Sequence, residues 1–181
     1  MKIIYLLSIL FFISKTSFAQ EKYLTKTGEI TFFSSAPLED ITAQNKEVLS
    51  IIDTNDGSTA IAIAMESFVF PNSLMQEHFN ENYVESEIYP KATFKGKIAD
   101  YTSLKKIEND NTITGELTIH GVTQNVVIPV KVSKHKKSIV LEGKFSVKLA
   151  DYNIDIPTIL FKNIAEEINI NFILEHQLYN N

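Results

Sequence analysis

Apolar and polar residues alternate one by one over most of the chain. The stretch SIVLEGKFSVKLA (138–150) places its apolar residues and Gly143 on one face and most of its charged residues on the other. The same period of two recurs at 25–35, 46–54, 57–66, 91–101, 115–132 and 168–175. Successive side chains of a β-strand point to opposite faces, so this pattern predicts about eight strands with one apolar face each.

Strands that are apolar on one face only are typical of antiparallel sheets. About eight such strands can curl into a barrel, which hides their edges. A barrel of that size is either filled by side chains or holds one small ligand. The pattern therefore predicts an all-β fold, an eight-stranded antiparallel barrel, formed by a single domain over residues 20–181.

One segment, FPNSLMQEHFNENYV (70–84), departs from the period of two. Asn72 or Ser73 is expected to cap a helix, because a side-chain oxygen there can accept a hydrogen bond from the first free backbone N–H groups. Five residues then share one helical stripe: Leu74, Met75, His78, Phe79 and Tyr83. We expect one short amphipathic helix that lies on the barrel or plugs it, with the stripe as core rather than as a cofactor site.

A long connection, DYNIDIPTILFKNIAEE (151–167), precedes the last strand. Asn153 and Pro157 indicate turns, and the apolar residues indicate that the segment folds back over apolar surface. Long loops of this kind are often functional. We expect a lid across one mouth of the barrel.

His120 stands between two facing apolar alternations in GELTIHGVTQNVVIPVKV (115–132). It follows Thr118 on the outward-facing side of its strand and precedes Gly121, which favours the corner of a hairpin. The alternative is a role in gripping a ligand headgroup or in sensing pH, since histidine is the side chain that titrates near neutrality.

The N-terminal segment has the features of a signal peptide. Lys2 is followed by an apolar run over 3–13 and by Ser17-Phe18-Ala19 before Gln20. The run is shorter than the ~20 residues of a membrane-spanning helix, and polar residues follow at once. We predict a signal peptide over 1–19, cleavage after Ala19, and a soluble product outside the cytoplasm rather than an uncleaved anchor.

Composition excludes several function classes. The chain has 17 Lys and Arg against 22 Asp and Glu and a net charge of −5, which argues against nucleic acid as a partner. It has no cysteine, its four histidines have no metal-ligand spacing, and no nucleophile elbow occurs. The segment TNDGST (54–59) lacks the glutamate of a calcium loop, so we interpret it as a hairpin turn with positive backbone angles at Asp56 and Gly57. We expect no metal, no cofactor and no catalytic residue.

The charged residues of the strands lie opposite the apolar face, so the lumen of a soluble barrel would hold almost no acid or base. General acid–base catalysis needs a titratable group within hydrogen-bond reach of its proton. An apolar lumen instead removes hydrocarbon surface from water, which stabilises by roughly 25 cal/mol per Å². The pattern favours an extended hydrocarbon ligand with a polar headgroup at the mouth.

The hairpin GELTIHGVTQNVVIPV resembles the signature hairpin of the YceI-like family of secreted polyisoprenoid-binding proteins. The resemblance continues in FVFPNSLMQEHFNENYVESEIYPKATFKGKI (68–98) and in LEGKFSVKLADYNIDIP (141–157), and it covers roughly residues 57–175. It implies an extended, lipocalin-like barrel, a periplasmic or secreted location, and an amphiphilic isoprenoid of the quinone or polyprenol type, or another long-chain amphiphile, in the lumen. The chain lacks the Trp and His residues that precede the family's first strand, so no headgroup contact is transferred.

The candidates for the lumen lining are chosen by one criterion, namely that each occupies an alternating position on the inward, apolar face of its strand (its inward parity). They are Phe94, Leu117, Ile119, Val130, Phe145, Ile170 and Phe172. Plain core packing is the alternative for each. For the whole chain, the alternatives are a barrel without a ligand that has a structural or stress-response role, an enzyme that uses His120 or a carboxylate at the mouth, and a small outer-membrane barrel. We expect no stable membrane insertion, and an exposed strand edge would allow two copies to pair as a homodimer.

Overall fold

The computed structural model describes residues 21–105, 107–157 and 164–179. Eight antiparallel strands form a closed barrel in sequence order, and the last pairs with the first. They are β1 (Lys22–Ser35), β2 (Asp40–Asp53), β3 (Ser58–Ala64), β4 (Lys91–Ile98), β5 (Glu108–Ile119), β6 (Val122–Lys134), β7 (Ser138–Lys148) and β8 (Glu167–Tyr179). The predicted fold class is confirmed.

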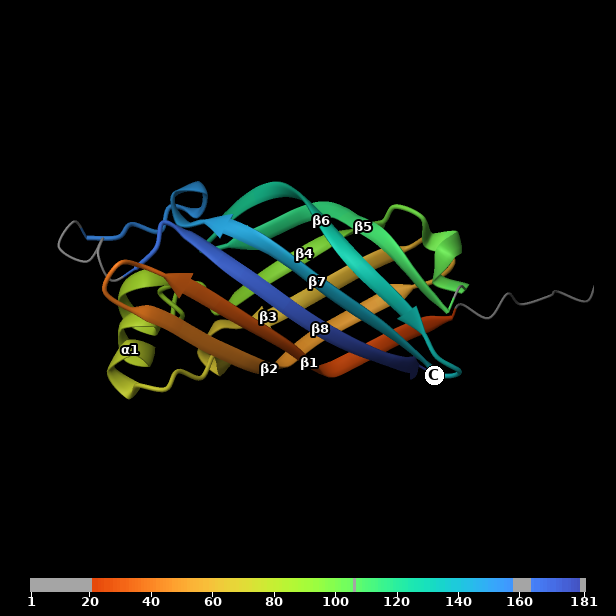
Figure 1. Ribbon diagram of the computed structural model, residues 1–181, viewed down its shortest axis with the longest axis horizontal. Coiled ribbons are helices and arrows are strands. Elements are labelled where there is room, and N and C mark those ends of the chain that lie inside the picture. Colours follow the sequence, from red (N-terminus) through yellow and green to blue (C-terminus); the bar gives the residue numbers. More distant parts are fainter. Residues whose placement is uncertain (1–20, 106, 158–163, 180–181) are drawn as a thin grey trace, which may run out of the picture.

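The barrel is elongated, and a helix lies across one of its ends (Figure 1). This helix, α1 (Ser73–His78), continues into a wider π-helical turn, η2 (Phe79–Tyr83). The side chain of Asn72 caps it by accepting a hydrogen bond from the Leu74 N–H, at 2.9 Å. The predicted amphipathic helix is therefore present, with Asn72 rather than Ser73 as its N-cap. No helix in the described ranges is long and apolar enough to span a membrane.

Strands β5 and β6 are joined by the two-residue turn His120–Gly121, between the paired residues Ile119 and Val122. Both turn residues have positive φ, +50° and +73°, as the tight turn that matches strand twist requires. His120 thus forms a hairpin corner, as predicted. The β2–β3 turn differs from its prediction, because only Gly57 has a positive φ there. Asp56 instead accepts hydrogen bonds from the Ser58 N–H and hydroxyl.

The barrel interior has two unequal halves. The half away from α1 is packed with fully buried side chains, among them Ile98, Ile113, Val132, Ile139 and Leu141. A buried polar pair is part of that half, His176 with Ser50. The half beneath α1 is less completely filled and contains the candidate site.

Candidate functional site

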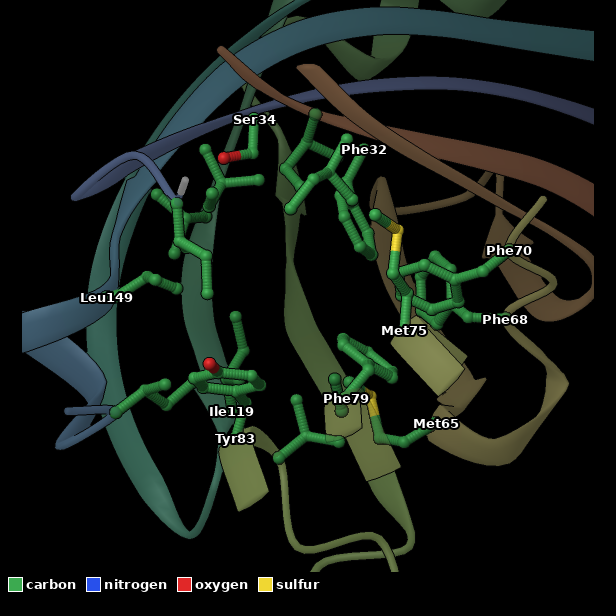
Figure 2. A pocket seen from close by; sticks show the side chains of 18 of the residues that line it. Phe32, Ser34, Met65, Phe68, Phe70, Met75, Phe79, Tyr83, Ile119 and Leu149 are labelled. Carbon is green, nitrogen blue, oxygen red and sulfur yellow. The ribbon is translucent and has the colours of Figure 1, made fainter. Parts of the chain in front are cut away.

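A cavity of about 480 Å³ occupies the half of the barrel beneath α1 (Figure 2). Its walls come from the inward faces of β1 to β5, β7 and β8, and its roof comes from the segment 65–84. The volume lies within the roughly 300–1,000 Å³ of small-molecule sites. The exposed side chains of Asn72, Leu74 and His78 mark its mouth.

Four phenylalanines hold the roof on the barrel rim. Phe79, at the junction of α1 and η2, packs against Phe32 of β1 and against Phe68 and Phe70, with ring centroids 5.0–5.6 Å apart. Each such pair contributes about 0.5–1.5 kcal/mol beyond burial of its area. The cluster fixes the helix over the cavity and makes this side of the lining aromatic.

The predicted helical stripe faces the cavity along its whole length. Its five members all line the cavity: Leu74, Met75, His78, Phe79 and Tyr83. The helix therefore closes the end of the barrel as a roof above a cavity rather than as a plug that fills it.

The polar groups deep in the lining are uncharged. Ser34 is buried, and its hydroxyl oxygen accepts a hydrogen bond from the Ala165 N–H at 2.9 Å, which leaves the hydroxyl hydrogen free to donate. Burial raises the pKa of the Tyr83 phenol above its ordinary value, so this hydroxyl is neutral at physiological pH. Figure 2 shows both oxygens at the cavity. The lining residues with an acidic or imidazole side chain, Glu39 and His78, are more exposed than Ser34.

The seven lumen residues selected by parity divide into two groups. Four line the cavity: Leu117, Ile119, Phe145 and Ile170. The other three are buried deeper in the barrel, away from the cavity: Phe94, Val130 and Phe172. Parity identifies the inward face of a strand but not the depth along the barrel axis.

Part of the lining was missed by the sequence reasoning. Phe68 and Phe70 follow the short helix η1 (Met65–Ser67) outside any strand. The alternation of apolar residues at 68 and 70 is a signal that could have identified both. Ile154 and Ile164 belong to the connection predicted as a lid and do line the cavity. Residues 158–163 of that connection lie outside the described part of the chain.

His120 is not directed outward, although its parity predicted this. Its side chain is only 11% exposed, and Nε2 lies 2.7 Å from Glu85 Oε2. Nδ1 lies 3.2 Å from the Tyr152 carbonyl oxygen, and Tyr89 packs edge-on against the ring. We call these four residues the rim knot. The contacts of these four residues connect the β5–β6 turn to the segment after η2 and to η4 (Leu149–Tyr152). His120 does not line the cavity.

The three non-glycine residues with positive φ in the described ranges gather at this rim. They are Glu85, His120 and Asn153, at +45°, +50° and +55°. Such backbone conformations are uncommon outside glycine and persist where surrounding contacts hold them. The described residues contain no cluster of three or more His, Asp or Glu side chains suited to a metal.

A closed barrel that encloses a roofed apolar cavity is the architecture of lipocalin-like binding barrels. Comparison with known proteins gives the family. The YceI-like domain matches residues 16–176, and the chain belongs to this family.

A curated relative is Protein YceI from Escherichia coli, which is 34% identical over 79 residues. That match spans 40% of this chain and only 39% of the relative.

Solved structures share the fold at low sequence identity. A polyisoprenoid-binding domain from Saccharophagus degradans has a TM-score of 0.78 at 17% identity, over 88% of this chain and 99% of that one. BcnA from Burkholderia cenocepacia has a TM-score of 0.69 at 22% identity, over 82% and 95%. The Campylobacter jejuni YCEI protein has a TM-score of 0.59 at 21% identity, over 76% and 84%.

Proposed function

We propose that this protein is an exported carrier that holds an amphiphilic isoprenoid lipid, of the quinone or polyprenol type, in its barrel cavity without catalysing a reaction. The observation that carries the proposal is the roofed cavity of about 480 Å³, whose deep lining is apolar apart from uncharged hydroxyls. Membership of the YceI-like family supports it, as does the shared fold with a domain described as polyisoprenoid-binding.

The energetics favour a hydrocarbon chain. Each buried CH₂ contributes about 0.8 kcal/mol, so ten of them would contribute ~8 kcal/mol before the loss of ligand freedom is subtracted. The Ser34 and Tyr83 hydroxyls can donate hydrogen bonds to a carbonyl or hydroxyl headgroup. Neither carries the positive charge that a phosphate headgroup requires, so a neutral headgroup fits better.

Catalysis has little support in this geometry. A general acid or base must lie within hydrogen-bond reach of the reacting atom. The titratable lining groups other than the neutral Tyr83 phenol are Glu39, which is half-buried, and His78, which is exposed at the mouth. We also propose that the signal segment is removed after Ala19, so that the protein acts in the periplasm or outside the cell.

The test is native mass spectrometry of the protein expressed with its own signal segment and purified without detergent, followed by organic extraction. We expect a mature chain that begins at Gln20 and carries one hydrophobic adduct. A chain that carries no adduct and also takes up neither a quinone nor a polyprenol on titration would refute the carrier function.

A matched pair of variants adds a control for position. Ile119→Glu places a charge in the lining, whereas Val127→Glu places the same charge on the outer face, where Val127 is 66% exposed. We expect Ile119→Glu to lose the adduct and Val127→Glu to keep it, with circular dichroism used to verify that both fold. Equal retention by the two variants would exclude the cavity as the binding site.

A further inference from the structure

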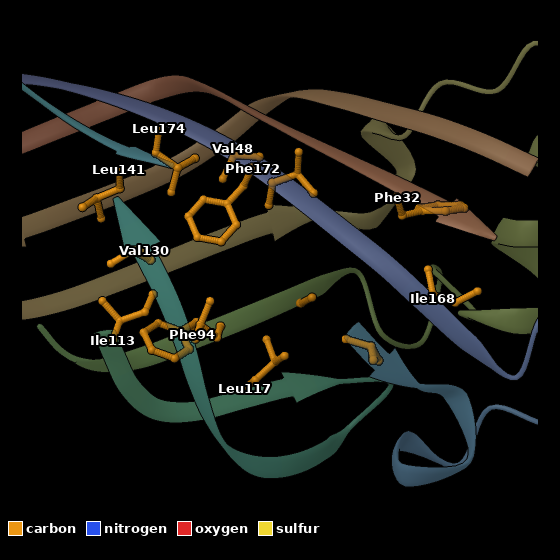
Figure 3. Close-up of a cluster of buried hydrophobic side chains, with 14 of the residues drawn as sticks. Phe32, Val48, Phe94, Ile113, Leu117, Val130, Leu141, Ile168, Phe172 and Leu174 are labelled. Carbon is orange, nitrogen blue, oxygen red and sulfur yellow. The ribbon is translucent and has the colours of Figure 1, made fainter. Parts of the chain in front are cut away.

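The cavity ends about halfway along the barrel, at one layer of inward residues. On β8, Ile168 and Ile170 line it, but Phe172, the next inward residue, does not. On β4, Ala92 lines it, but Phe94 does not. Both phenylalanine rings are buried and lie inside the barrel below the cavity (Figure 3).

The Phe172 ring occupies the space over its cross-strand partner, which is a glycine. Gly143 of β7 pairs directly with Phe172. A Cβ built on Gly143 would come within 2.3 Å of the tip of the ring, so no other residue fits while the ring stays in place. Phe145, two residues toward the mouth, touches Phe172 edge-on at 6.3 Å between centroids and does line the cavity.

The same arrangement recurs around this layer. A Cβ on Gly96 would lie 2.5 Å from the tip of the Phe94 ring, and the facing Gly115 leaves no room for a side chain either. A Cβ on Gly28 would lie 2.4 Å from a methyl group of Leu174. Gly96 and Gly143 thus make space for the two phenylalanine rings that close the barrel, and Gly28 makes space for Leu174 just below them, whereas a side chain on Gly115 would meet the backbone of β4 at Lys95.

Below this layer the barrel is filled. Leu141 and Leu174 are fully buried there and lie on the far side of the two rings from Leu117 and Ile168 (Figure 3). Strand β8 continues for four residues from Phe172 to His176, which is about 10 Å along the axis at a rise of ~3.3 Å per residue and a tilt of ~40°. A long hydrocarbon chain would need that depth, and side chains occupy it.

We propose that Phe94 and Phe172, seated on Gly96 and Gly143, form a floor that sets the length of the bound chain. The inference rests on the proposed carrier function and makes it more specific: the protein selects amphiphiles whose apolar part fits the outer half of the barrel. A chain longer than the cavity leaves its remaining carbons in water and gains no affinity from them.

The experiment measures affinity, by quenching of intrinsic tyrosine fluorescence or by calorimetry, for benzoquinones with short, medium and long isoprenoid tails. For the wild type we expect affinity to rise with tail length and then to level off. Phe172→Ala should move that plateau to longer tails, because truncating a large buried side chain opens on the order of 150 Å³. Each additional buried CH₂ then adds roughly fourfold in affinity.

Three further variants separate a change of the floor from a loss of folding. Phe172→Leu makes a smaller opening at a lower cost in stability, and Ala92→Leu fills the bottom of the cavity and should move the plateau to shorter tails. Ile139→Val removes one methylene from the far end of the barrel and should leave the plateau unchanged.

The outcomes distinguish the two proposals. A wild type that binds no tail length refutes the carrier function itself. A wild type whose affinity continues to rise through the longest tail, or a folded Phe172→Leu and Phe172→Ala pair with an unchanged plateau, refutes the floor while leaving the carrier function intact.

Discussion

His176 lies at the end of the barrel opposite the cavity and has no exposed surface. Its Nδ1 is 3.1 Å from the Ile139 carbonyl oxygen, so Nδ1 donates, and its Nε2 accepts the Ser50 hydroxyl hydrogen at 2.8 Å. A neutral ring satisfies both contacts, whereas a protonated ring would bury a charge and turn a donor toward Ser50. Burial lowers the pKa of His176 from 6.5 to about 4, and hydrogen bonds to the Ile139 and Leu174 backbone oppose this only partly.

The sign of the pH effect follows from these two values. Between pH 6.5 and about 4 the unfolded chain binds a proton at His176 and the folded chain does not, so acid favours unfolding. The stabilising contribution is complete above pH 6.5 and disappears as the pH falls through about 4. At about 1.4 kcal/mol per pH unit, the contribution of His176 to the free energy of unfolding falls by about 3 kcal/mol in total. About 2 kcal/mol of this is already lost at about pH 5.

Urea unfolding of the wild type and of His176→Gln, near pH 7 and near pH 5, measures this contribution. Glutamine can donate to the Ile139 carbonyl and accept from Ser50 but does not titrate. We expect the free energy of unfolding of the wild type to fall by about 2 kcal/mol more than that of the variant. The remaining titrating groups are common to both proteins and cancel. Equal losses in the two proteins would refute the assignment of a buried neutral imidazole.

Two other contacts give predictions that need no ligand. Gly143→Ala should lower the free energy of unfolding by about 1–3 kcal/mol, because its Cβ meets the Phe172 ring. Adding Phe172→Leu should recover part of that loss in urea titrations, and strictly additive effects would show that the two residues do not meet. His120→Ala should cost about 1–3 kcal/mol, measured as a lower melting temperature, because it leaves Glu85 and the Tyr152 carbonyl without their partner. An unchanged melting temperature would show that the rim knot does not hold this end together.

The structural elements that depend on residues close together in the sequence were predictable. The period of two gave the eight strands, and the stripe behind Asn72 gave the helix, because both depend on neighbours within a few residues. The β5–β6 corner was predictable for the same reason, since Gly121 marks a tight turn between two alternations.

The inward face of a strand was harder to predict where the strand carries a bulge. In β1, Thr25 and Gly28 are both buried although their parity differs, and the pairing with β2 shifts register between them. A bulge inserts one residue and reverses the parity beyond it. Gly28 marks a place where a bulge can form, but the register shift itself is fixed by contacts with the neighbouring strands.

The burial of His120 was not predictable from its strand. Parity describes regular strands, but the positive φ of a turn residue directs its side chain differently. The partners of the ring, Glu85 and Tyr152, are 35 and 32 residues away in sequence. Only the closed barrel brings them to one rim, so the sequence could suggest a special histidine but not what it contacts.

The depth at which an inward side chain lies along the barrel axis is the property that local sequence patterns predict least well. The glycines on the inward faces of the strands are the residues that determine it. In the sequence, Gly96 and Gly143 look like gaps in an apolar face. In the structure each of these glycines leaves space for a ring. Gly96 accommodates the Phe94 ring of its own strand, and Gly143 accommodates the Phe172 ring of the facing strand. A glycine beside an inward phenylalanine therefore marks a layer where a barrel closes, whereas an unbroken apolar face beside small residues such as Ala92 marks a layer that stays open. The boundary between packed core and cavity then follows from pairing register and residue size together, which explains why Phe145 and Phe172, on the same inward face and in contact, belong to different parts of the interior.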